Sequence, residues 1–389
     1  MQTSRLPTII ALGTAQTLGW GSTYYLPAVL ADGISQDVGL STNLFFGTFS
    51  ASLIISALIG PKVGRAIDRA GGNGVLSISS LLFASALCLL AYAHSYVMFA
   101  LAWVLMGIGM GLGLYDAAFA TLGRLYGRDA RGAITGITLL AGFASTIGWP
   151  LTAWGASEVG WRDTCLAWAA AHIVLGLPLN YFLPRPRDLA VSAKVADAPV
   201  PIDRTMVLLA FAFAAAWIVT AGMAAHFPRI AEAAGASPAQ AIAAGALIGP
   251  AQVGARMLEA SFLSRIHPLV SARLATTTHP VGAAVIAVAG GGVAAGAFAV
   301  LHGMGNGIIT IARGTVPLAL YGPQNYGYRL GLLGMPSRFL SAGAPLVFSI
   351  LIDRMGAGVL LVTSGLSLSA VLALCLIRLA AAAAVEVVS

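Results

Sequence analysis

The sequence predicts an all-α membrane protein of twelve transmembrane helices, arranged as two pseudo-symmetric bundles of six. Hydrophobic residues make up 58% of the chain and charged residues 9%, with a mean hydropathy of +0.87. One water-soluble core of 389 residues cannot hide so much apolar surface. Apolar stretches of roughly 20 residues recur along the chain, each long enough to cross the hydrocarbon layer as a helix. The alternating pattern of a membrane β-barrel is absent from the sequence, so helices are expected to satisfy the backbone in lipid.

The apolar stretches divide into two sets of six. The first six spans are expected at residues 6–31, 41–66, 74–93, 96–122, 132–156 and 165–183. The other six are expected at residues 205–227, 239–262, 271–293, 296–320, 331–352 and 359–379. The first span is longer than a signal-peptide core and lacks a convincing small-residue cleavage site. We therefore expect it to remain in the protein as the first helix.

A polar, proline-rich segment separates the two sets. Residues 184–204 read PRPRDLAVSAKVADAPVPIDR, which is typical of a linker. We therefore expect one bundle over residues 1–183, a cytoplasmic linker over 184–204 and a second bundle over 205–389. The halves share features at an offset of 195 to 196 residues, among them a glycine triplet at 107, 109 and 111 that recurs at 303, 305 and 307. Two such repeats are typical of transporters that hold substrate near the bilayer midplane between them.

The positive charges lie mainly on one side of these spans. With the amino terminus inside, fifteen of the 21 lysines and arginines fall on the cytoplasmic side. Only Arg162, Arg229 and Arg354 fall outside. This asymmetry predicts a multi-pass protein of the bacterial inner membrane with both termini in the cytoplasm. The net charge of +7 is then explained by the basic cytoplasmic side of a protein that spans the lipid bilayer, and no nucleic-acid partner is expected.

A motif after the second span supports this architecture. Residues 64–71, GRAIDRAG, resemble the GxxxDRxGR signature that follows the second helix in the major facilitator superfamily, although Gly72 and Asn73 replace its last basic residues. The second-half counterpart ends in Arg265 but has Ser264 at the acidic position. The resemblance covers essentially the whole chain. It implies a monomeric secondary transporter that works by alternating access, with no cofactor.

The same resemblance assigns gating residues. In that family the aspartate of the motif acts as a cap and pairs with basic residues on neighbouring helices. This contact stabilises one access state and breaks in the other. By match to the motif, Asp68 and Arg69 are expected to gate transport, with Arg265 as the second-half counterpart. Gly64 is expected to permit close approach of helices, as small residues do in lipid.

Four ionisable residues lie within the spans that line the cavity in this family. They are Asp116, Arg256, Arg313 and Arg338. Charges inside a bilayer are costly and usually face a cavity or a partner. Three arginines against one carboxylate favour an anionic substrate, because guanidinium groups grip carboxylates through paired hydrogen bonds.

Arg256 and Arg338 are the expected clamp, since arginine in the eighth helix and a basic residue in the eleventh resemble the monocarboxylate and oxalate/formate branch. That branch's acidic partner before the eighth-helix arginine is missing here. Structural pairing is the alternative, with Asp116 bound to an arginine or Arg256 to Glu259 one turn away.

Asp116 is the candidate for proton coupling, because a buried carboxylate resists ionisation. Permanent pairing with Arg313 is the rival interpretation. Tyr25 and His226 occupy matching outer positions in the first and seventh spans and are expected to contact substrate.

Other functions fit less well. An enzyme would need a convergent nucleophile or metal site, and the sequence contains no HExxH, no GxSxG and no clustered His and Cys, so neither catalysis nor a metal cofactor is expected. A metal transporter is suggested only by methionines such as Met106 and Met110, which are ordinary packing residues. Efflux of drugs or metabolites is the strongest rival, and it would be favoured by an aromatic, weakly charged cavity.

Overall fold

The computed structural model describes residues 5–185 and 199–378. Most of the expected linker lies outside these residues, including Arg187 and Lys194, which are expected on the cytoplasmic side. Every regular element in the described residues is a helix, as the sequence predicts. Eight helical stretches are, by length and composition alone, long and apolar enough to cross a membrane.

The first bundle contains six spans, of which only the second and third are single unbroken helices. Its helices are α1 (Arg5–Ser22), α2 (Pro27–Val38), α3 (Thr42–Ala70), α4 (Asn73–Ala91), α5 (Tyr96–Gly113), α6 (Tyr115–Tyr126), α7 (Arg131–Ala141), α8 (Ala144–Glu158), α9 (Gly160–Ala171) and α10 (Leu177–Tyr181). A π-helical turn, His172–Gly176, joins α9 to α10.

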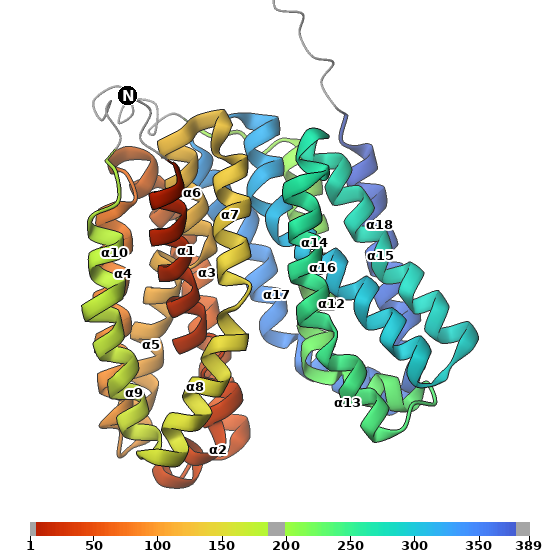
Figure 1. Ribbon diagram of the computed structural model, residues 1–389, viewed down its shortest axis with the longest axis horizontal. Coiled ribbons are helices and arrows are strands. Elements are labelled where there is room, and N and C mark those ends of the chain that lie inside the picture. Colours follow the sequence, from red (N-terminus) through yellow and green to blue (C-terminus); the bar gives the residue numbers. More distant parts are fainter. Residues whose placement is uncertain (1–4, 186–198, 379–389) are drawn as a thin grey trace, which may run out of the picture.

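The second bundle contains longer, mostly unbroken helices. They are α12 (Arg204–Ala233), α13 (Pro238–Ala246), α14 (Ile248–Ser261), α15 (Pro268–Ala289), α16 (Gly291–Tyr321), α17 (Tyr326–Met355) and α18 (Val359–Leu376). The pairs α1/α2, α5/α6, α7/α8, α9/α10 and α13/α14 each make one span, so the expected twelve spans in two bundles are confirmed. Figure 1 shows the two bundles side by side, with α17 between them.

The break between α5 and α6 positions the most important carboxylate. α5 ends in a glycine-rich run, and glycine is a weak helix former. Leu114 adopts an extended conformation, and the side-chain amide of Gln16 donates to the carbonyl oxygen of Gly113 over 2.6 Å. α6 therefore begins inside the bundle, with Asp116 in its first turn. The positive end of a helix dipole lies there and favours a negative charge.

The two bundles meet most closely where α3 crosses α17. Gly60 and Gly64 of α3 face Gly331 and Gly327 of α17. A methyl group on Gly64 would overlap the carbonyl oxygen of Gly327, so nothing larger than glycine fits without separating the backbones. The close approach expected at Gly64 is therefore present, and it joins one bundle to the other.

Candidate functional site

A buried ion cluster lies between the bundles. The carboxylate of Asp116 on α6 accepts from Arg338 Nη2 of α17 over 2.7 Å and lies 3.4 Å from Arg313 Nη2 of α16. The side chains of Asp116, Arg313 and Arg338 are only 10%, 11% and 16% exposed. The structure thus brings together three of the four charges that the sequence singles out, and Asp116 is paired with Arg313 as the rival interpretation expects.

Further contacts hold both arginines in place. Arg338 Nη1 donates to the Ser56 carbonyl oxygen of α3 over 3.1 Å. The Arg313 guanidinium lies 4.6 Å from the ring centre of Trp217 on α12, which is cation–π geometry. Gly334 leaves space for the carboxylate, because a Cβ there would lie 2.6 Å from Asp116 Oδ2.

A small cavity of about 40 Å³ opens onto this cluster. Its lining includes Asp116, Arg313 and Arg338 together with aromatic side chains. Two guanidinium groups and one carboxylate leave one formal positive charge in a poorly hydrated site, to which the amino-terminal end of α6 adds partial positive charge. Such an arrangement can bind an anion.

The aromatic part of the lining consists of Trp20, Tyr24, Tyr115 and Trp217. Sequence reasoning did not select these residues. They could have been selected from the sequence by their positions. They lie on the first, fourth and seventh spans, which line the cavity in the resembled family.

Arg256 occupies a different place. Its side chain donates to the carbonyl oxygen of Thr138 on α7 over 2.8 Å and lies 3.5 Å from Gln252 Oε1. The residue is buried and is not among those that line the cavity. The alternative pairing of Arg256 with Glu259 is wrong, because Glu259 instead accepts from Arg131 over 2.6 Å. Arg313 and Arg338 thus share the carboxylate of Asp116, whereas the expected clamp of Arg256 and Arg338 on a substrate stays a prediction.

The two outer residues also lie apart from the ion cluster. Tyr25 is half-buried, and its ring centre lies 5.7 Å from that of Trp149. His226 is half-buried in α12. Their expected contact with substrate stays a prediction.

Asp68, the expected gate residue, links the bundles at one end. Its carboxylate accepts from the backbone N–H groups of Gly327 and Tyr328, each over 2.9 Å, and so caps the start of α17 from α3. The Arg65 guanidinium lies 4.0 Å from the ring centre of Tyr328. Arg69 is exposed in the last turn of α3. The sequence motif located this contact but did not reveal that its partner is a helix terminus.

A second connection lies at the crossing of α7 and α14. Arg131, the first residue of α7, donates to the buried Glu259 and to the carbonyl oxygens of Leu263 and Ile266, over 2.8 and 2.6 Å. Arg265 is exposed beside it, in the turn that follows α14. Capping of helix-end carbonyls by arginine is favourable at the negative end of the dipole.

Both connections lie at the end of the molecule where α1 begins and α18 ends. In Figure 1 this is the upper end, where α3, α6, α14 and α16 end and α7 and α17 begin. The two bundles are therefore joined at the end of the molecule that carries the start of α1 and the end of α18.

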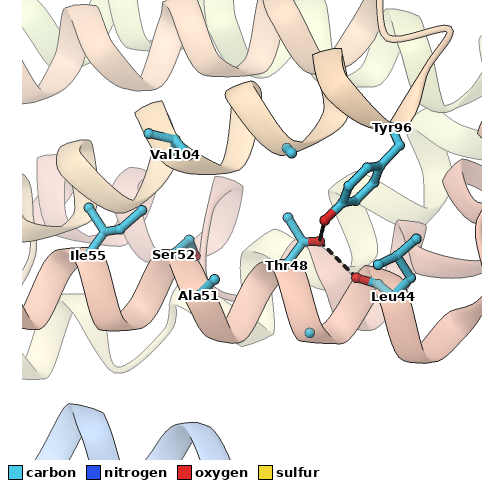
Figure 2. A pocket seen from close by; sticks show the side chains of 9 residues that line it. Leu44, Thr48, Ala51, Ser52, Ile55, Tyr96 and Val104 are labelled. Carbon is cyan, nitrogen blue, oxygen red and sulfur yellow. Dashed lines mark hydrogen bonds between the residues drawn. The ribbon is translucent and has the colours of Figure 1, made fainter.

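A larger cavity, about 210 Å³, lies elsewhere between α3 and α5. Figure 2 shows it lined by small and apolar side chains, with the Tyr96 hydroxyl 3.5 Å from Thr48 Oγ1. None of its nine lining residues is charged, and Leu44, Tyr96 and Val104 are exposed. It is a groove of the outer surface, apart from the ion cluster.

Comparisons with known proteins agree with this fold. A family model described as Major Facilitator Superfamily matches residues 12–345. No curated protein matches the sequence. Three solved structures share the fold at TM-scores of 0.73, 0.75 and 0.72.

These are the human organic anion transporter MFSD10 (TETRAN), a single-residue variant of the E. coli fucose:proton symporter FucP, and the proton:xylose symporter XylE bound to 6-bromo-6-deoxy-D-glucose. Their identities to this chain are 16%, 14% and 12%. The matches cover 96%, 97% and 95% of this chain and 100%, 100% and 94% of theirs. At such low identity the likeness shows the fold alone.

Proposed function

The chain belongs to the major facilitator superfamily, whose members are transporters, and we propose that its cargo is a small organic anion bound by Arg313 and Arg338. The observation that carries the proposal is the sharing of one carboxylate by two buried arginines. Each guanidinium has five N–H donors, and Asp116 engages only one nitrogen of each. The remaining donors can receive a substrate carboxylate, which then competes with Asp116 for the two guanidinium groups.

Displacement of Asp116 would couple binding to movement of the bundles. Asp116 belongs to the first bundle and both arginines to the second. When a substrate carboxylate takes the arginines, that attraction between bundles is lost. A carboxylate left buried without a cation partner binds a proton, because burial disfavours the charged form. We therefore propose that anion and proton bind together, for symport or exchange by alternating access.

This coupling predicts proton uptake on binding. The affinity of the purified protein for an anion such as benzoate, at pH values where benzoate stays ionised, should rise about tenfold for each unit that the pH falls, because one proton is linked to binding. Calorimetric titration in buffers of different ionisation enthalpy measures the proton uptake directly. Asp116→Asn should abolish the pH dependence, whereas His226→Gln should retain it. An affinity independent of pH in the parent protein would contradict coupling at Asp116.

We further propose that the protein is a monomer in the bacterial inner membrane, with both termini cytoplasmic. The joined end of the bundles is then the cytoplasmic end, and the structure represents an outward-facing state. The charge asymmetry of the sequence supports this orientation.

Cysteine labelling tests the orientation. In a background lacking Cys88, Cys165 and Cys375, a cysteine replacing exposed Asp129 should react with an impermeant maleimide only from the cytoplasmic side. A cysteine replacing exposed Asp37 should react only from outside. The reverse pattern would overturn the orientation. Asp197, in the expected linker, lies outside the described residues.

Efflux of drugs or metabolites is the second candidate. The aromatic lining of the cavity favours it, since flat apolar compounds pack well on such surfaces. The two arginines favour an anion over the neutral or cationic compounds typical of broad efflux. Binding of neutral or cationic dyes in preference to organic anions would support this alternative.

A further inference from the structure

The cavity at the ion cluster has two unlike walls. The second bundle supplies the cationic wall, Arg313 and Arg338, along with the ring of Trp217. The first bundle supplies an aromatic wall, in which Trp20 comes from the end of α1, Tyr24 from the turn that follows it and Tyr115 from the start of α6. A ligand between these walls meets a charge on one side and ring faces on the other.

The aromatic wall carries a polar group with no partner. Trp20 is 9% exposed, and its indole Nε1 has no hydrogen-bond acceptor among the described residues. Buried indole N–H groups usually have a partner. The nitrogen is itself covered by protein atoms, so a ligand oxygen accepts from it only once the surrounding aromatic side chains separate.

The aromatic contacts continue from the cavity towards the unjoined end of the bundles. The ring centre of Trp20 lies 5.0 Å from that of Tyr115, 5.2 Å from that of Tyr24 and 6.0 Å from that of Tyr25. Tyr25 in turn contacts Trp149, which is 45% exposed. Successive rings thus extend from an exposed side chain to the cavity that the arginines line.

From these observations we infer that the anion carried by this protein is an aromatic carboxylate, with its carboxylate on Arg313 and Arg338, its ring against Trp20, Tyr24 and Tyr115, and an oxygen substituent accepting from Trp20 Nε1. The inference rests on the proposed function and narrows its substrate class. It separates this site from one for formate or oxalate, which have no ring to cover the aromatic wall.

The volume of the cavity adds a condition. At about 40 Å³ it has room for water but not for a ring, since an apolar cavity that binds benzene measures about 150 Å³. Ring binding therefore requires Asp116 to leave the arginines and the aromatic side chains to separate. A short aliphatic anion requires only the first of these changes.

Binding of matched acids to the purified full-length protein tests the inference. Benzoate and cyclohexanecarboxylate share one charge and nearly one size, and we expect benzoate to bind about fivefold tighter, because ring contacts add affinity beyond buried area. 4-Hydroxybenzoate should bind about threefold to tenfold tighter than benzoate, through the added hydrogen bond.

Two tryptophan variants assign the donor. Trp20→Phe keeps a ring but removes the N–H, so it should abolish the preference for 4-hydroxybenzoate over benzoate. Trp103→Phe is the matched control, because Trp103 is also buried with an unpartnered Nε1 but does not line the cavity. The Trp103→Phe variant should keep the preference for 4-hydroxybenzoate over benzoate.

The outcomes separate the two proposals. If acetate, oxalate and cyclohexanecarboxylate bind as tightly as benzoate, the aromatic inference is wrong while the anion proposal stands. If the hydroxyl preference survives Trp20→Phe, the assigned donor is wrong. If no anion binds and neutral or cationic ring compounds do, the proposed function itself fails.

Discussion

Arg338→Gln is expected to weaken binding of an organic anion by about 30-fold to 150-fold. A buried, charge-assisted hydrogen bond contributes on the order of 2 to 3 kcal/mol, and each 1.4 kcal/mol changes affinity tenfold. Arg338 makes the shorter of the two contacts to Asp116, so its guanidinium is already oriented for a carboxylate. Arg338→Lys should recover only part of the affinity, because an ammonium group lacks the planar fork. Titration calorimetry on protein of unchanged melting temperature measures both effects.

Arg256→Gln is the matched control for this result. It removes a buried arginine of the same bundle that donates to Thr138 and does not line the cavity. We expect lower stability but nearly unchanged affinity. If Arg256→Gln weakens binding as much as Arg338→Gln does, the clamp consists of Arg256 and Arg338, as the sequence alone predicts.

Gly64→Ala is expected to open the joined end of the bundles. The added methyl group overlaps the backbone of Gly327, which no side-chain movement relieves. Overpacking of this kind costs about 1–3 kcal/mol or more, enough to shift the balance between access states by roughly tenfold or beyond. A cysteine replacing Ser341, which lines the cavity, reports the change through its reaction with a thiol reagent applied from the joined side.

Gly132→Ala is the control for the gate. Gly132 lies in α7 near the same end, and a Cβ there meets nothing within 4 Å. We expect the Ser341 position to stay protected in Gly132→Ala and to become reactive in Gly64→Ala. Equal protection in both variants would show that the α3–α17 crossing does not control access.

Asp68→Asn should also favour opening of the joined end, as Gly64→Ala does, but through the loss of a charge and not through overpacking. The neutral amide keeps an oxygen but loses the charge that stabilises the start of α17. Charged hydrogen bonds contribute about 1.5–3 kcal/mol, so the joined state should lose roughly tenfold or more in population. Exchange of substrate across proteoliposome membranes should slow much more than equilibrium binding weakens. A normal rate of substrate exchange in this variant would show that Asp68 does not control access.

Much of the fold was predictable because its causes are local in the sequence. Apolar spans, charge asymmetry and the GRAIDRAG motif follow from composition and short patterns. The break at Leu114 was missed, because glycine runs such as GIGMGLG also occur in continuous packed helices. The equivalent run in α16 is continuous, so the run alone does not decide between the two.

The site was only partly predictable because its contacts join distant parts of the chain. Asp116, Arg313 and Arg338 were selected as charges inside spans, but which arginines share the carboxylate depends on how α16 and α17 pack on α6. Arg131 and Glu259 lie 128 residues apart, and no short pattern connects them. The cap formed by Asp68 uses backbone N–H groups, which every residue except proline possesses, so side-chain identity could not reveal it.

The affinity of Asp116→Asn for benzoate is the most direct test of the central claim that substrate and Asp116 compete for the same two arginines. If they compete, removing the Asp116 carboxylate should tighten binding of benzoate at pH 7 by about tenfold or more. In the variant, benzoate no longer has to break the charge-assisted contact between Asp116 and the arginines. Calorimetric titration of parent and variant, each with its melting temperature recorded, gives the answer. Weaker binding by a well-folded variant would instead mean that Asp116 only positions the arginines, and would contradict the displacement mechanism.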